Sequence, residues 1–403
     1  MPKKLVFTCL INFFIAAILG LALRYTYLLP ISINYRFLTH AHSHVAMLGW
    51  VYLMIYTLFV HYFIPNKKPV YNTLFWVTQI AVVGMLLSFP FQGYAAISIT
   101  FSTLHIFCSY YFVRLIWKNH KTQSTTSKLL LKASLLFMLI STIGVWCLGP
   151  AVGLLGQASA FYQIAIQFFL HFQFNGWFLI AVLAIFFHKL QLTDSKQFQR
   201  FFKLLIASTI LTFALPVNWF VPHAVFLWLN GLGVVLQIAA LLIFIKLIKA
   251  PFKIVLKQSH KLIRFMFQFA MFFFILKIGL QTLSLIPDIS NTAFQHRNLV
   301  IGFIHLTMLG VISGFLFAYI LQTKLVKPNK TLTIGMYVFV LGFVLTELIL
   351  IAQGGLFYFG AGLIPKYYLL LFISSLLLPL GILSLILNIL KPNNYDTKTL
   401  KET

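Results

Sequence analysis

The chain has 403 residues, of which 61% are hydrophobic and only 9% are charged, and its formal net charge is +25. Soluble domains carry about 25% charged residues, so this composition excludes an ordinary soluble protein. The basic residues stand between long apolar segments, as they do in integral membrane proteins, so we expect a lipid bilayer and no nucleic acid as the partner.

Long apolar segments recur along the whole chain. A helix needs about 20 mostly apolar residues to cross the hydrocarbon core of a membrane. Twelve stretches qualify: residues 5–29, 41–63, 71–91, 94–117, 129–155, 158–187, 201–222, 224–248, 262–286, 298–323, 331–353 and 367–390. The sequence therefore predicts an all-α integral membrane protein, with residues 1–390 forming a single domain of about twelve transmembrane helices.

The basic residues alternate between the two ends of these helices. One side holds pairs and runs of lysine and arginine, such as Lys67 and Lys68, whereas the other side holds only isolated residues such as Arg24 and Lys366. Cytoplasmic loops carry the excess of positive charge, so we expect both termini in the cytoplasm, with residues 391–403 forming a short tail. The expected location is a bacterial inner (cytoplasmic) membrane.

The second predicted helix opens with three alternating histidines. Residues 39–50 read T-H-A-H-S-H-V-A-M-L-G-W, and a related phrase, I-H-L-T-M-L-G-V, occurs at residues 304–311 in the tenth helix. Ionisable residues inside a membrane are costly and usually mark functional sites. His44 and His305 stand at matching positions and at similar depth in helices that enter from the same side.

Neutral imidazoles at matching depth on two helices are suited to axial ligation of a haem iron. We expect His44 and His305 to be the ligands, with Gly49 and Gly310 leaving bare backbone for the flat macrocycle; hydrogen bonding of the histidines between helices is the alternative. His42 lies two residues from His44, and a helix turns by about 200° over that interval, so only one of the two can face the haem.

Other polar residues inside or beside the predicted helices also have candidate roles. Arg36 and Arg297 lie close to the histidines and are candidates for pairing with haem propionates, or are plain boundary arginines. Glu347 and Lys277 are expected to form an ion pair, because each charge offsets the other's desolvation. His105 is expected to be a packed polar residue. Four further histidines are candidate ligands of a second metal, copper or a second haem iron: His171, His223, His40 and His296.

The twelve spans and the histidines near the outer starts of helices 2 and 10 and within helix 6 resemble the heme-copper oxidase subunit I superfamily. The resemblance implies a low-spin haem, b-type here, held by His44 (or His42) and His305. It also implies electron transfer or O2 and NO chemistry, with a cytochrome or quinol donor and partner subunits. The oxygen-reducing site is incomplete, since Phe303 replaces its haem ligand and no H-P-E-V-Y follows His171.

The motif His40, Ala41, His42 at the start of helix 2 is also similar to that of the NnrS family, membrane proteins with haem and copper linked to nitric oxide stress. That resemblance implies a stress protein in place of an oxidase, and it tolerates the missing oxidase ligands. A membrane transporter whose histidines bind a metal without haem is the alternative from another functional class. Whether the chain is an enzyme stays open at this point.

Overall fold

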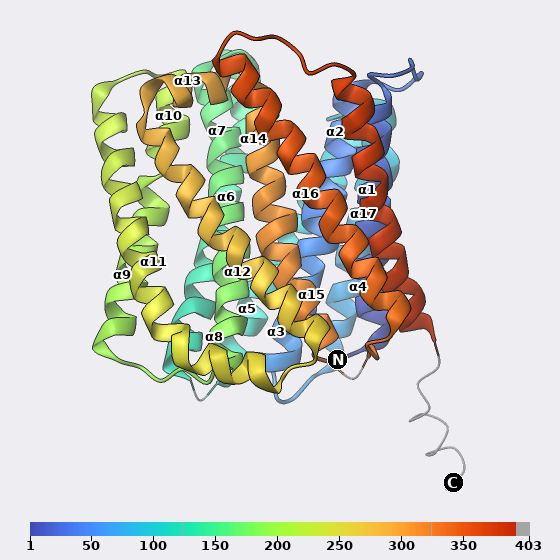
Figure 1. The fold of residues 1–403 in the computed structure, drawn as a ribbon, viewed down its shortest axis with the longest axis vertical. Helices are drawn as coiled ribbons and strands as arrows, with labels where there is room; N and C mark the ends of the chain where they lie inside the picture. Colours follow the sequence, from blue (N-terminus) through green and yellow to red (C-terminus); the bar gives the residue numbers. More distant parts are fainter. Residues whose placement is uncertain (123, 324, 392–403) are drawn as a thin grey trace, which may run out of the picture.

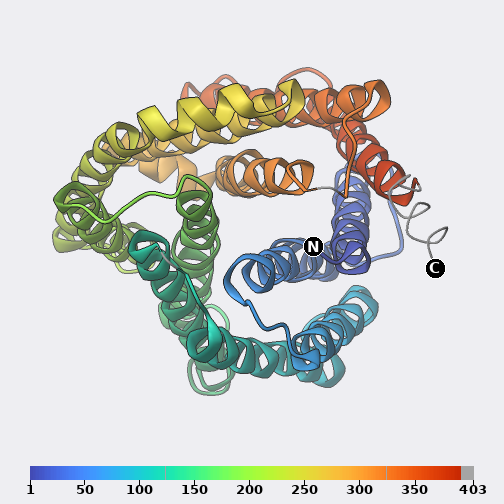
Figure 2. The ribbon, with the colours of Figure 1, turned by 90° about the horizontal axis from the view of Figure 1, so that it is seen from below.

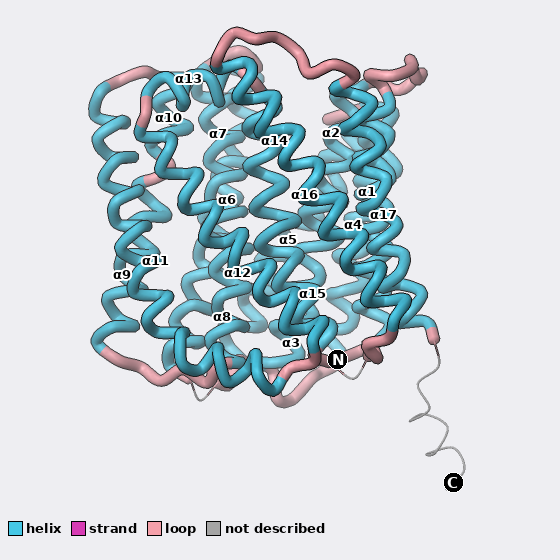
Figure 3. The backbone as a smooth tube through the Cα atoms, viewed as in Figure 1, coloured by secondary structure: helices cyan, strands magenta, loops and turns pink. Residues whose placement is uncertain are grey.

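The structure is a computed structural model that describes residues 1–403 except 123, 324 and 392–403. Within these described residues all regular elements are helices and no strand occurs (Figure 3). Twelve helical segments of this part of the chain are long and apolar enough to cross a membrane. The predicted all-α bundle of about twelve spans is therefore confirmed. The expected cytoplasmic tail lies, apart from Lys391, outside the described residues.

Of the twelve spans in the described part of the chain, nine surround the other three. Figure 2, a view along the bundle, shows the orange tenth span enclosed by the yellow and red-orange helices at the edge. The nine are α1 (Lys3–Tyr25), α4 (Pro69–Gln92), α5 (Ala96–Asn119), α6 (Thr125–Leu155), α9 (Lys196–Leu211) with α10 (Ala214–Phe220), α11 (Ala224–Gln258), α12 (Lys261–Thr282) with η3 (Leu283–Leu285), α16 (Lys330–Tyr358) and α17 (Tyr367–Leu390).

The second, sixth and tenth spans form the centre, and each changes from α-helix to π-helix and back. They are α2 (Tyr35–His44), η1 (Val45–Tyr52) and α3 (Leu53–Phe63); α7 (Ala160–His171), η2 (Phe172–Phe178) and α8 (Leu179–Lys189); and α14 (Arg297–His305), η4 (Leu306–Ser313) and α15 (Gly314–Leu321). In their most apolar stretches 78%, 78% and 61% of the residues are buried, against 33–56% in the other spans. Their mostly apolar sequences are therefore explained by burial in protein as well as by the bilayer.

The chain passes through the same local arrangement three times. The span that precedes each central helix packs on its π segment: α1 on η1, α6 on η2 and α12 on η4. Each π segment begins directly after a histidine, and a glycine follows that histidine five residues later. The fold thus repeats a unit of four spans, with one histidine-bearing central helix in each unit.

Hydrogen bonds made by side chains join the three central spans. Trp50 Nε1 in η1 donates to Ser313 Oγ in η4 at 2.9 Å, and Tyr319 OH in α15 donates to Val182 O in α8 at 3.0 Å. Lipid tails are as apolar as leucine side chains, so helices in a membrane associate through close packing and such bonds. These contacts fix the relative positions of the three histidine-bearing helices.

The start of α1 and the end of α17 lie at the same end of the bundle, the lower end in Figure 1. Lys67 and Lys68, between α3 and α4, are among the residues of this basic end. The arrangement agrees with the alternation of charge in the sequence. That this end faces the cytoplasm stays a prediction.

The eighth span extends further than predicted. α11 continues to Gln258, whereas residue 248 was expected to be its end, and it contains Pro251. Proline lacks the N–H that bonds to the carbonyl four residues earlier, so it kinks a helix without ending it when both flanking segments are stabilised by other contacts. The last turns of α11 run along the lower end of the bundle in Figure 1 before α12 returns through the membrane. A short helix that was not predicted, α13 (Pro287–Gln295), lies at the opposite end.

Candidate functional site

A histidine ends the first α-helical part of every central span. His44, His171 and His305 are followed by η1, η2 and η4, respectively. At 1.5 Å per residue they lie about 12–17 Å below the outer starts of their helices, so their depths are similar. π-Helical segments are uncommon and concentrate at functional sites. The three histidines are therefore candidate functional residues.

The sixth span contains a third copy of the histidine phrase, which was not predicted from the sequence. Residues 171–177 read H-F-Q-F-N-G-W, and residues 44–50 read H-V-A-M-L-G-W. The shared spacing of histidine, glycine and tryptophan was the available signal. It was overlooked because the methionine used to align the first and third copies is absent from the second.

His42 is held in one tautomer by the first span. Its Nδ1 lies 2.8 Å from Ala16 O. A carbonyl oxygen only accepts hydrogen bonds, so Nδ1 carries the hydrogen and Nε2 carries the free lone pair. The close approach needs Gly20, because a Cβ at that position would lie 3.0 Å from His42 Cε1. His42 thus presents an oriented nitrogen donor next to α1.

His305 lies in the same region as His42. Its ring is half-buried. Arg24 of α1 and His42 of α2 are the charged or titratable groups that act on it electrostatically. One histidine of the second span and one of the tenth span are therefore close enough to interact electrostatically.

His44 faces a different set of neighbours. Its ring packs against Phe89 with the ring centroids 4.4 Å apart, and its Nδ1 donates to His40 O at 2.8 Å. Nε2 then accepts from Tyr94 OH at 3.3 Å. His44 was favoured in the sequence as the partner of His305, but the contacts place His42 on that side. A helix turns by about 200° between positions 42 and 44, so the two side chains point in nearly opposite directions. The shared spacing of histidine and glycine in the sequence does not show which of the two faces the tenth span.

A half-buried arginine and a buried glutamate stand beside the pair of His42 and His305. Arg24 Nη1 donates to Leu371 O at 3.1 Å, and its charge interacts with that of Glu347. Glu347 is 4% exposed, and its Oε1 has no hydrogen-bond partner among the described residues. Its Oε2 lies 3.5 Å from the place that a Cβ on Gly302 would occupy, one turn before His305. Spans 1, 2, 10 and 11 thus contribute two histidines and two opposite charges to one region.

Arg24 was missed as a site residue because it was counted among the residues of the external loops. The arginines that were predicted to meet haem propionates are both exposed. Arg36 Nη2 donates to Gln157 Oε1 at 3.4 Å, and Arg297 begins α14. Their pairing with propionates stays a prediction, but Arg24 is the arginine that lies next to the histidine pair.

The expectation for Gly49 and Gly310 is wrong. A Cβ on Gly49 would lie 2.9 Å from Val82 Cγ1 and 3.0 Å from Asn12 Cβ, and one on Gly310 would lie 2.8 Å from Phe343 Cζ. Side chains of neighbouring helices fill the space against both glycines. Their small size serves helix packing, so neither glycine leaves bare backbone open.

The expected ion pair between Lys277 and Glu347 is also wrong. Lys277 is fully buried, its Nζ donates to Gln281 Oε1 at 3.2 Å, and it lies 5.3 Å from the centroid of the Phe303 ring. Glu347 interacts with Arg24 instead. The tenth span separates the two groups, since α12 packs on η4 from one side and α16 packs on α14 from the other.

The four candidate ligands of a second metal do not come together. His171 Nε2 donates to Thr209 O at 2.7 Å, whereas His223 is exposed and caps α11 by accepting from Val225 N. His40 packs 4.6 Å from the Tyr94 ring, and His296 stacks on Phe357 at 4.3 Å. Among the described residues no group of three or more histidine, cysteine or acidic side chains is arranged around a common centre. A copper site stays a prediction without geometric support.

The local backbone explains the contact of His171. Phe213 N bonds to Ile210 O, three residues back, where α9 ends. Thr209 O therefore lacks the partner that a continuing α-helix would supply, and the imidazole satisfies it. His171, in the second unit of the fold, thus has a structural partner.

No protein-family model matches this chain. No curated protein sequence matches it either. Its function is therefore inferred from the residues of the central helices and their neighbours.

Proposed function

We propose that this protein is a membrane haem protein that transfers electrons and that holds its haem between the second and tenth spans. His42 and His305 are the residues that would hold its iron. The observation that carries the proposal is the position of these two imidazoles in one region, with the Nδ1 hydrogen of His42 engaged by Ala16 O and its Nε2 free.

The residues present fit a haem in their chemistry. Donation from Nδ1 to a carbonyl fixes the ring orientation and raises the basicity of Nε2, as in many metal-bound histidines. Arg24 is the candidate partner for a propionate, because arginine binds carboxylates through two parallel hydrogen bonds. Leu371 O, which accepts from Arg24 Nη1, holds that side chain in place.

The donor set favours electron transfer over gas chemistry. A haem held by two imidazoles would supply reversible one-electron transfer. Phe303 stands where the superfamily implies the ligand of an oxygen-reducing haem, and its ring faces Lys277. A cytochrome or a quinol is the class of electron donor that such a protein would use. The alternative function linked to nitric oxide requires a second metal site.

Absorption spectroscopy tests the proposal directly. The purified wild-type protein, produced with sufficient haem, should show a Soret band and a sharp reduced α-band. His42→Ala and His305→Ala should each abolish the six-coordinate low-spin spectrum. His44→Ala is the matched control, because it removes the same side chain two residues away and should leave the spectrum intact.

Three outcomes separate the alternatives. A wild-type protein without a Soret band would refute haem binding and favour the transporter with metal-binding histidines. Loss of the spectrum in His44→Ala with retention in His42→Ala would restore the ligand assignment favoured by the sequence. Bound copper in stoichiometric amount would support the resemblance to NnrS proteins.

A further inference from the structure

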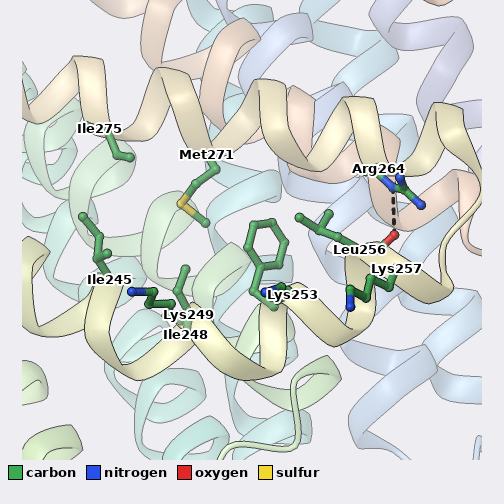
Figure 4. A pocket seen from close by; sticks show the side chains of 10 residues that line it. Ile245, Ile248, Lys249, Lys253, Leu256, Lys257, Arg264, Met271 and Ile275 are labelled. Atoms are coloured by element: carbon green, nitrogen blue, oxygen red, sulfur yellow. Dashed lines mark hydrogen bonds between the residues drawn. The ribbon is translucent and has the colours of Figure 1, made fainter.

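The long eighth span and the ninth span enclose a groove at the basic end of the bundle. The groove has a volume of about 370 Å³ and lies between α11 and α12. Figure 4 shows its lining side chains on both helices. It is distinct from the histidine pair, which lies among spans 1, 2, 10 and 11.

The walls and the rim of the groove differ in chemistry. The walls include Ile245, Ile248, Met271 and Ile275, and the rim includes the basic residues Lys249, Lys253, Lys257 and Arg264 (Figure 4). No acidic residue lines it. The apolar part lies on the membrane-spanning sections of α11 and α12, whereas the basic part surrounds the turn between them.

The kinked end of α11 produces this separation. Lysines 249, 253 and 257 recur every four residues and so lie on one face of the helix, and all three are exposed. Ile248, Phe252 and Leu256 lie toward the protein, with Ile248 buried. After Pro251 the helix runs along the end of the bundle, which is the position of an amphipathic helix at a membrane interface.

Arg264 completes the rim from the opposite helix. Its Nε donates to Leu256 O at 2.9 Å, as the dashed line in Figure 4 shows. The bond ties the start of α12 to the end of α11 and holds the guanidinium beside the lysines. A guanidinium fixed in this way retains donors for a phosphate.

We propose that this groove binds an anionic phospholipid of the leaflet at the basic end. The acyl chains lie against the apolar walls, and the phosphate lies among Lys253, Lys257 and Arg264. Basic pockets between membrane helices on that side bind anionic head groups through charge attraction, and the apolar walls match the hydrocarbon chains. A zwitterionic lipid fits the same walls but lacks the net charge that the rim selects.

The test compares lipids and variants on the delipidated full-length protein in detergent. Binding of phosphatidylglycerol and of phosphatidylcholine with the same acyl chains is measured by native mass spectrometry and by the shift of the melting temperature. The wild type should bind phosphatidylglycerol preferentially. Replacement of Lys253 and Lys257 by glutamine should weaken that binding by roughly 25-fold, at about fivefold per lysine near the surface.

Two further variants make the test specific. Lys196→Gln with Lys203→Gln removes the same charge from a hollow at the same end that is lined by polar and charged residues only, and should leave binding unchanged. Ile275→Trp should weaken binding by filling the apolar part of the groove. Equal binding of both lipids, or equal losses in the groove and control variants, would overturn the proposal.

Discussion

The polar contact between the first and third spans allows a stability prediction with a definite size. Asn12 Nδ2 donates to Gly49 O at 2.9 Å and to Gln79 Oε1 at 2.7 Å, and Gln79 Nε2 donates to Asn12 Oδ1 at 3.0 Å. Asn12 is 3% exposed and Gln79 is 9% exposed. The asparagine therefore links α1 and α4 and also satisfies a carbonyl of the π segment η1.

Asn12→Ala removes three hydrogen bonds and leaves two buried polar groups without partners. Each buried group without a partner costs about 1–3 kcal/mol, although hydrogen bonds between membrane helices average only about 0.6 kcal/mol. We expect Asn12→Ala to lower the free energy of unfolding by about 2–4 kcal/mol. Gln79→Leu should lower it by about 1–2 kcal/mol, because it breaks the amide pair but keeps the bond to Gly49 O.

A double-mutant cycle measures the coupling in reversible unfolding from mixed micelles. Asn12→Leu and Gln79→Leu are combined, since leucine keeps much of the side-chain volume. Either single substitution already breaks the amide pair. The free energy of unfolding of the double variant should therefore fall by about 1–2 kcal/mol less than the sum of the two single decreases. Additivity within about 0.3 kcal/mol would refute the reasoning that the two amides act as one unit.

Four further predictions concern other parts of the structure. Gly20→Leu should abolish the proposed haem spectrum by displacing the His42 ring, whereas Gly149→Leu, where nothing lies within 4 Å of the added Cβ, should not; equal spectra in both would contradict the role of Gly20. Gly144→Ala places a Cβ 2.5 Å from Ala165 O and should lower the free energy of unfolding by about 1–3 kcal/mol, while Gly153→Ala should raise it by about 0.5–1 kcal/mol; the reverse order in the same unfolding assay would disprove the packing argument. Lys277→Met should raise the free energy of unfolding by at least ~1 kcal/mol, because it removes a fully buried charge without an anionic partner among the described residues; a loss of stability would mean that the charge is compensated. In a variant without Cys9, Cys108 and Cys147, Lys67→Cys should react with a membrane-impermeant thiol reagent only from the cytoplasmic side, and Lys366→Cys only from the other; the opposite labelling would invert the predicted topology.

The number and positions of the spans followed from the sequence because the bilayer demands about 20 apolar residues for each crossing. The end of α11 did not, since the same lysines that suggested a loop after residue 248 are compatible with a helix lying at the membrane interface. Charge alone cannot distinguish these two structures. The apolar residues between the lysines, with the helical spacing of Ile248, Phe252 and Leu256, were the signal for a helix.

The candidate site was predicted in part. The sequence pointed to histidines on the second and tenth spans, and the structure places His42 and His305 in one region. It could not choose between His42 and His44, because the rotation of a helix that changes to π geometry is set by its neighbours, here Ala16 and Gly20 of α1. Nor could it assign Arg24, because only the three-dimensional packing shows that this residue points inward to Leu371 rather than to solvent.

The histidine pair also constrains how the protein is made. His42 belongs to the second span to be synthesised and His305 to the tenth, and Arg24 is anchored by Leu371 in the last span. At roughly 5–20 residues per second, the ribosome reaches His305 roughly 13–50 s after His42. During that interval the first spans hold only one of the two imidazoles. The haem that we propose would therefore be inserted late in biogenesis, after the tenth span has joined the first two.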